Sequence, residues 1–170
     1  MTQPAKWYEL KAAVRAAGEP TAAEVFIYGN IGDRWDENGV VAADLVRELS
    51  ALDVEEITVR INSFGGSVTD GLAIYNGLRR HRAAIAVHID GVAISIASLI
   101  AMAGDTITMA ENAQMMIHAP WTIAIGNSKD MREQADVLDR YARAMGSSYS
   151  SKSTLSPDEC LALLTDGQDH

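Results

Sequence analysis

The sequence lacks several features that secreted, membrane-spanning or nucleic-acid-binding proteins require. Among its 170 residues there is a single cysteine, Cys160, which excludes an intrachain disulfide framework and favours a reducing compartment. Basic residues number 14 against 23 acidic residues, giving a net charge of −9. Nucleic acids and anionic membranes attract basic surfaces, so we predict no nucleic-acid and no membrane partner.

Long apolar runs are also missing. The longest, residues 92–103, contains two serines and is too short to span a bilayer. The N-terminal residues contain no uninterrupted apolar segment, so no secretory signal is visible and we expect a cytoplasmic protein. The sequence contains no HExxH, CxxC, GxxxxGK or GxGxxG pattern, and we therefore predict neither a metal nor a cofactor.

The residues that are present predict one α/β domain over 1–170. Hydrophobic residues make up 48% of the chain, enough for one substantial core. Strand-like alternation, as in Ile57, Val59 and Ile61, is followed by helical spacing and then by alternation again. Asp90-Gly91 is expected to turn one strand into a helix that Gly104 ends. This order predicts a largely parallel sheet. The expected strands are 24–29, 57–61, 85–89, 106–109 and 115–118, and the expected helices 41–52, 68–78 and 95–103.

A different pattern follows Trp121. A polar connector precedes residues 131–145, whose apolar side chains recur at helical spacing, and residues 146–154 are expected to form a turn. Ser156, a proline and then Glu159 are typical of a helix start. We expect the apolar stripe of 131–145 to project from the core and to be covered by a partner chain.

Ser95 is the candidate nucleophile. It lies among small residues at the start of an apolar helical segment, where first-turn N–H groups are free. Ser98 lies one turn later, inside the helix, where packing or local backbone bonding is expected. His118 follows an apolar strand and precedes a proline, so it is the candidate base that activates the hydroxyl. The alternative interpretations are an ordinary N-cap serine and a core histidine.

The glycine pair Gly65-Gly66 completes this group. Its backbone N–H groups could stabilise the negative charge that develops on a carbonyl oxygen during acyl transfer. The three segments together indicate a serine hydrolase site rather than three unrelated features.

These segments resemble the Clp protease family of serine peptidases. The family has a Gly-x-Ala-x-Ser turn with the nucleophile, a Met-Ile-His-x-Pro segment with the base, and an Asn-Ser-Pro-Gly-Gly turn with an oxyanion donor. The matching residues are Gly91, Ala93 and Ser95, then Met116, Ile117, His118 and Pro120, then Asn62, Ser63, Gly65 and Gly66. Phe64 stands where the family has proline. The resemblance extends from about Glu24 to the end of the chain.

The resemblance implies a fold and a set of site residues. The fold is the spiral ββα superhelix shared with crotonases, with a head at about 24–121 and a protruding handle helix within about 122–165. The family continues beyond the last residue of this chain, so we expect the C-terminal end to be missing. The implied catalytic residues are Ser95, His118 and Asp166, with Asp169 as the alternative acid. Gly66 and Ile96 are the implied oxyanion donors.

The resemblance also implies a function. We expect ATP-independent peptide hydrolysis by a self-compartmentalising serine endopeptidase that forms a homo-oligomeric ring around its polypeptide substrate. The sequence motifs are most similar to those of phage and prophage Clp-like proteases, which implies head maturation or protein degradation in a bacterial host cell. The substrate stays open among scaffold protein, capsid protein and unfolded chains in general. No ATPase unfoldase partner is assigned. Two alternatives stay open, a crotonase-type acyl-CoA enzyme and a non-catalytic ring subunit of the same fold.

Overall fold

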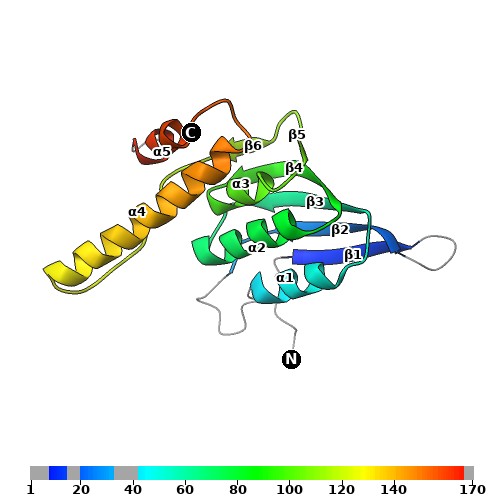
Figure 1. Ribbon diagram of the computed structural model, residues 1–170, viewed down its shortest axis with the longest axis horizontal. Coiled ribbons are helices and arrows are strands. Elements are labelled where there is room, and N and C mark those ends of the chain that lie inside the picture. The colour runs from blue at the N-terminus through cyan, green and yellow to red at the C-terminus, as the bar shows by residue number, and fades with distance from the viewer. Residues whose placement is uncertain (1–7, 15–19, 33–41, 167–170) are drawn as a thin grey trace. The chain divides into compact units, whose positions relative to one another are not determined.

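The protein is described by a computed structural model over residues 8–14, 20–32 and 42–166 (Figure 1). The chain forms two compact units, Met1–Met115 and Met116–His170, which are described separately below. The first contains the sheet and three helices, and the second contains two helices. The predicted α/β class is confirmed, and it is consistent with the Clp-protease-like fold.

The first unit is built on a six-stranded sheet. Its strand order is β1 (Tyr8–Val14), β2 (Pro20–Tyr28), β3 (Glu56–Ser63), β4 (Ala84–Ile94) and β5 (Thr106–Met109), and β6 (Gln114–Met116) also pairs with β4. The β2–β3, β3–β4 and β4–β5 pairs are parallel, as the sequence predicts. The carboxyl ends of β2, β3 and β4 therefore meet at one edge of the sheet.

Helices α1 (Ala42–Ala51), α2 (Val68–Arg80) and α3 (Ile96–Ala101) lie side by side on one face of this sheet (Figure 1). Apolar side chains at helical spacing, such as Leu45 and Ile74, are fully buried. The alternating strand residues Ile57, Val59 and Ile61 are equally buried. Each such side chain contributes about 1.5–3 kcal/mol when it leaves water, so these residues form the core.

Strand β1 was not predicted, because nothing in the sequence before Glu24 matched a recognisable pattern. It pairs antiparallel with β2, with Tyr8 opposite Ile27. The Tyr8 hydroxyl donates a hydrogen bond to Glu48 Oε1 at 2.9 Å, which links the edge strand to α1. Burial, together with this hydrogen bond, raises the pKa of the Tyr8 phenol.

The predicted turn at Asp90-Gly91 is wrong, because β4 continues to Ile94. Ile89 pairs with Ile61 and Ala93 pairs with Ser63, so four steps along β4 match two steps along β3. This irregularity is a bulge that lengthens β4 and shifts its last residues relative to β3.

The bulge is held by Asn62, whose side-chain oxygen accepts the Val92 N–H at 3.2 Å. A Cβ at Gly91 would lie 2.5 Å from that oxygen, so a larger residue would displace the Asn62 side chain from this position. The glycine that resembled a turn residue is therefore a point of close backbone contact inside a strand.

The second unit contains α4 (Ser128–Ser150) and α5 (Pro157–Thr165). Helix α4 begins at a capping box formed by Asn127 and Asp130, which the sequence analysis missed. The predicted capping box of Ser156 and Glu159 at α5 is confirmed.

The predicted turn at 146–154 is wrong over its first five residues, because α4 extends through them. A Cβ at Gly146 would lie 3.1 Å from the Pro157 carbonyl oxygen and 3.2 Å from the Leu161 nitrogen. Glycine therefore lets α5 approach α4 closely, and this packing outweighs the weak helix propensity of Gly and Ser.

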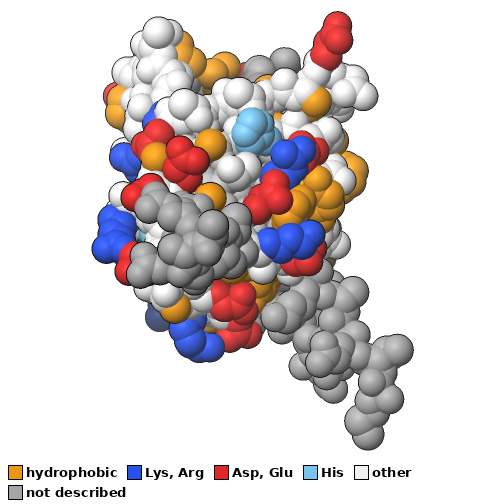
Figure 2. All heavy atoms as spheres, turned by 90° about the vertical axis from the view of Figure 1, so that its right-hand side faces the viewer, with side chains coloured by type: hydrophobic (Ala, Val, Ile, Leu, Met, Phe, Trp, Pro, Cys, Tyr) orange, Lys and Arg blue, Asp and Glu red, His pale blue; other side chains and the backbone are white. Residues whose placement is uncertain are grey.

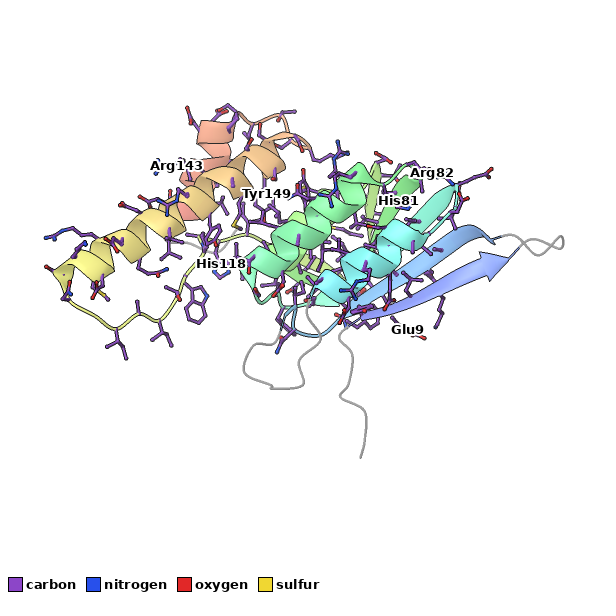
Figure 3. All side chains as sticks on the ribbon, turned by 60° about the horizontal axis from the view of Figure 1, so that its bottom comes forward. Glu9, His81, Arg82, His118, Arg143 and Tyr149 are labelled. Atoms are coloured by element: carbon purple, nitrogen blue, oxygen red, sulfur yellow. The ribbon has the colours of Figure 1, made fainter. Side chains whose placement is uncertain are left out.

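The prediction that the stripe of 131–145 is uncovered holds only for its first part. Met131 is exposed, whereas Ala142 and Met145 are buried. Residues 117–127 form no helix or strand and run along α4 (Figures 1 and 3). Within the described ranges, no helix has the length and apolar character needed to cross a membrane.

Candidate active site

Ser95 lies at the junction of β4 and α3, where it is the N-cap of the helix. Its backbone has φ 56° and ψ −131°, and it is the only non-glycine residue with positive φ in the described part of the chain. Its half-buried side chain makes no capping hydrogen bond, unlike that of an ordinary N-cap serine. The junction is therefore strained, and the hydroxyl is not used to start the helix.

Ser98 behaves as the sequence analysis expects. It is buried within α3, and its hydroxyl donates to the Ser95 carbonyl oxygen at 2.5 Å. This bond stabilises the backbone of the junction and directs the Ser98 hydroxyl towards a carbonyl group.

The glycine pair lies directly against Ser95. Gly65 and Gly66 have φ of 94° and 144°. A Cβ at Gly65 would lie 2.8 Å from Ser95 Cβ and 3.2 Å from the Ile96 nitrogen. The fold therefore brings three of the predicted site segments together: the Gly65-Gly66 turn, the Ser95 side chain and the backbone N–H of Ile96.

The turn is fixed by hydrogen bonds to the end of β2. The Ile31 N–H donates to the Gly65 carbonyl oxygen, and the Ser67 N–H donates to the Ile31 carbonyl oxygen, both at 2.8 Å. Between these bonds, the N–H of Gly66 donates to no group among the described residues, and the same holds for the N–H of Ile96. These two backbone donors follow directly after Gly65 and Ser95, the two residues that are in contact, and free N–H groups of this kind can stabilise an oxyanion.

Ser63 holds the turn in place through its side chain, a role that the sequence motif did not assign to it. It is fully buried, donates from its hydroxyl to the Gly29 carbonyl oxygen at 2.6 Å, and accepts the Gly65 N–H at 3.1 Å. A serine that ends a strand two residues before a glycine pair is the signal that could have identified this role.

Charged residues hold the beginning of the bulge. Arg60 donates to both carboxylate oxygens of Asp90, at 2.9 Å from Nε and 2.5 Å from Nη2. The Tyr28 hydroxyl donates to Asp90 at 2.6 Å. Burial, followed by this hydrogen bond, raises the pKa of the Tyr28 phenol. The strand that leads to Ser95 is therefore fixed at Asp90 by side chains from β2 and β3.

The second unit contains the other two predicted catalytic residues. His118 is half-buried, two residues after β6, in the segment that leads to α4 (Figure 3). Asp166 is exposed at the C-cap of α5, with φ −71° and ψ −4°. Asp169 lies outside the described residues. Ser95 belongs to the first unit, so its pairing with His118 and Asp166 stays a prediction.

The other described histidines form structural hydrogen bonds. His88 Nδ1 lies 2.6 Å from Thr108 Oγ1, and His81 Nδ1 accepts the Ala83 N–H at 3.0 Å.

Basic and acidic side chains are intermixed on the face that Figure 2 shows. Among the described residues, no three His, Cys, Asp or Glu side chains gather as metal ligands would.

Comparison with known proteins adds independent information. The family model described as Clp protease matches residues 20–167. Three similar curated proteins are ATP-dependent Clp protease proteolytic subunits. The one from Chlorella vulgaris is 27% identical over 155 residues, 84% of this chain and 77% of the relative. The one from Oltmannsiellopsis viridis is 28% identical over 156 residues, 84% and 79% of the two chains. The one from Pleurastrum terricola is 31% identical over 125 residues, 71% and 63% of the two chains.

Proposed function

Because the chain belongs to the Clp protease family, we propose that it hydrolyses peptide bonds as a serine endopeptidase. The observation that carries this proposal is the junction at Ser95. Its hydroxyl makes no capping hydrogen bond, and the adjacent N–H groups of Gly66 and Ile96 have no acceptor among the described residues. A nucleophile beside two free backbone donors is the arrangement that acyl transfer needs.

In the proposed reaction, the Ser95 oxygen attacks the carbonyl carbon of the peptide while His118 takes the hydroxyl proton. The carbonyl oxygen becomes an oxyanion and accepts hydrogen bonds from the N–H groups of Gly66 and Ile96. His118 then donates the proton to the leaving amine, and water hydrolyses the acyl-serine by the reverse order of steps. Asp166 accepts a hydrogen bond from His118 and stabilises its charged form.

We further propose that the active protein is a homo-oligomeric ring. The supporting observation is the handle patch, which we define as Trp121, Ile123, Ile125 and Met131. These side chains are exposed by 71%, 80%, 97% and 37%, although all four are large and apolar. Exposed apolar clusters of this kind mark surfaces that bind other chains, and a second copy of the chain is the proposed partner.

The substrate class that we propose is unfolded or flexible polypeptide, cleaved without ATP. ATP dependence is stated in the names of the three relatives and is a property of those proteins. In this chain the glycine pair is followed by Ser67 and Val68 and is not part of a phosphate-binding pattern. The motifs around Ser95 and His118 resemble those of phage and prophage proteases. Scaffold or capsid protein in a bacterial host is therefore the substrate to test first.

A fluorophosphonate probe tests the proposal, because it reacts with activated serine hydroxyls. We expect the wild-type protein to be labelled at Ser95, as located by mass spectrometry, and to cleave fluorogenic peptides in the absence of ATP. Ser95→Ala should abolish both properties, a loss of at least about a thousand-fold. Ser98→Ala is the matched control and should keep labelling.

Two outcomes would contradict the proposal. Labelling and cleavage that persist in Ser95→Ala would exclude Ser95 as the nucleophile. A correctly folded wild-type ring that neither reacts with the probe nor cleaves any peptide would indicate a non-catalytic subunit or an acyl-CoA enzyme of the related crotonase fold.

A further inference from the structure

Phe64 is the residue of the glycine turn that departs from the family motif, which has proline at this position. Its side chain is 67% exposed, although the preceding residue, Ser63, is fully buried and the following residue, Gly65, is buried as well. The described part of the first unit has two other exposed large apolar side chains, Tyr28 at 42% and Met109 at 45%. Among the described residues of this unit, Phe64 is therefore the most exposed large apolar side chain.

The backbone on both sides of Phe64 is fixed. Before it, the Ser63 hydroxyl donates to the Gly29 carbonyl oxygen and accepts the Gly65 N–H. After it, the Gly65 carbonyl oxygen accepts the Ile31 N–H at 2.8 Å. Phe64 is thus an aromatic side chain on a rigid turn, and such a side chain loses little conformational entropy when it binds a partner.

The turn also places Phe64 close to the candidate nucleophile. A Cβ at Gly65 would touch Ser95 Cβ at 2.8 Å, and consecutive Cα atoms are about 3.8 Å apart. Phe64 directly precedes Gly65, the residue that contacts Ser95. It lies on the same turn as the N–H of Gly66. A substrate carbonyl that accepts a hydrogen bond from this N–H would lie two residues along the chain from Phe64.

From this geometry we propose that Phe64 is a specificity-determining residue that contacts an apolar side chain of the substrate, next to the peptide bond that is cleaved. The proposal rests on the function proposed above and adds the chemical class of residue that the site prefers. Burial of the exposed ring against an apolar or aromatic substrate side chain removes both from water, which favours such peptides over those with small or charged residues.

Two kinds of probe test this role in the full-length protein. The first is a fluorophosphonate without a peptide part, which reports only on the reactivity of Ser95. The second is a pair of peptidyl phosphonates that differ at the residue next to the phosphorus, phenylalanine in one and alanine in the other. We expect the wild-type protein to react about ten-fold faster with the phenylalanine probe.

In Phe64→Ala this preference should fall to near unity, while the rate with the simple fluorophosphonate stays unchanged. Phe64→Leu, which keeps an apolar side chain, should retain an intermediate preference. Phe64→Pro, which restores the family residue, should behave as the alanine variant does.

The outcomes separate this proposal from the one on which it rests. An unchanged preference in Phe64→Ala, with normal labelling, would overturn the role of Phe64 and leave the peptidase function intact. Loss of reaction with the simple probe in all three variants would also overturn it, because Phe64 would then support the turn. A wild-type protein that reacts with none of the probes would refute the proposed function and, with it, this proposal.

Discussion

The glycine turn at Ser95 and the handle patch differ in what they present to their surroundings. At the turn, neighbouring segments approach so closely that a Cβ at Gly65 would lie 2.8 Å from Ser95 Cβ, and hydrogen bonds fix the backbone. In the handle patch, Ile125 is 97% exposed and belongs to no helix or strand. The turn should therefore be sensitive to the addition of a single carbon atom, and the patch to the addition of a charge.

The largest expected effect comes from Gly65→Ala. The backbone at Gly65 has φ 94°, and its Cβ would also lie 2.8 Å from the Ile94 carbonyl oxygen. We expect the resulting backbone strain to lower the free energy of unfolding by about 1–3 kcal/mol. Displacement of the proposed oxyanion donors, the N–H groups of Gly66 and Ile96, should lower the rate of fluorophosphonate labelling about a hundred-fold.

The control for this variant is Gly77→Ala in α2. A Cβ there would lie 3.4 Å from a Val46 methyl group, an ordinary contact, and alanine favours the helix by about 0.5–1 kcal/mol. For both variants, denaturant unfolding measures the free energy of unfolding, and the fluorophosphonate probe measures the rate of labelling. Equal labelling by the two variants would show that the approach of the turn to Ser95 does not matter.

A charge in the handle patch should have the next largest effect. Ile125→Asp should convert the proposed oligomer to smaller species, because the carboxylate would lose its water in an apolar interface. Thr122→Asp is the control, since Thr122 is exposed in the same segment and is already polar. Size-exclusion chromatography with light scattering measures both. An Ile125→Asp protein that stays fully assembled would exclude this patch as the interface.

A smaller and local effect is expected at the start of α4. The Asn127 side chain accepts the N–H groups of Lys129 and Asp130 at 2.8 and 3.2 Å. Asn127→Ala should cost about 1 kcal/mol and increase amide hydrogen exchange in the first turn. Ser128→Ala changes the adjacent residue without removing the cap and should leave exchange unchanged. Similar exchange in both variants would argue against a role for the capping box.

The smallest effect concerns pH at the start of α5. Hydrogen bonds from the backbone and side chain of Ser156 lower the pKa of Glu159 below its ordinary 4.5. Because the folded-state pKa is lowered, the stabilisation is complete above 4.5 and is lost as the pH falls through the folded value. NMR titration of the Glu159 carboxyl should show the lowered pKa. In Glu159→Gln, the protection of the amides in that turn, measured relative to their intrinsic exchange rates, should no longer fall as the pH falls through this range. A Glu159 carboxyl that titrates at its ordinary value would contradict the prediction.

The sequence predicted the elements whose signals are local. The apolar spacing of α2 and the capping residues of α5 identify these helices without knowledge of their neighbours. The bulge at Asp90-Gly91 could not be predicted, because its cause is the Asn62 side chain on another strand. Likewise, residues 146–150 are helical because Gly146 packs against α5, and local propensity alone favours a turn there.

In the candidate site, too, some features have local sequence signals and others depend on contacts with distant segments. The sequence motifs predicted Ser95 as the candidate nucleophile and the glycine pair as its neighbour, but the strained φ of Ser95 depends on contacts between separate strand ends. Neither the buried position of Ser63 nor the exposure of Phe64 follows from residue type, since serine is usually exposed and phenylalanine usually buried. Those two assignments required the three-dimensional contacts.

The parallel strand ends around Ser95 have a consequence for the time course of folding. Ile31 follows β2, Gly65 follows β3 and Ser95 follows β4, so the contacts among them join residues that are about thirty positions apart. Such non-local pairs form late, after the intervening helices have closed the loops. We therefore expect Ser95 to acquire its strained conformation only when the ends of three strands have come together.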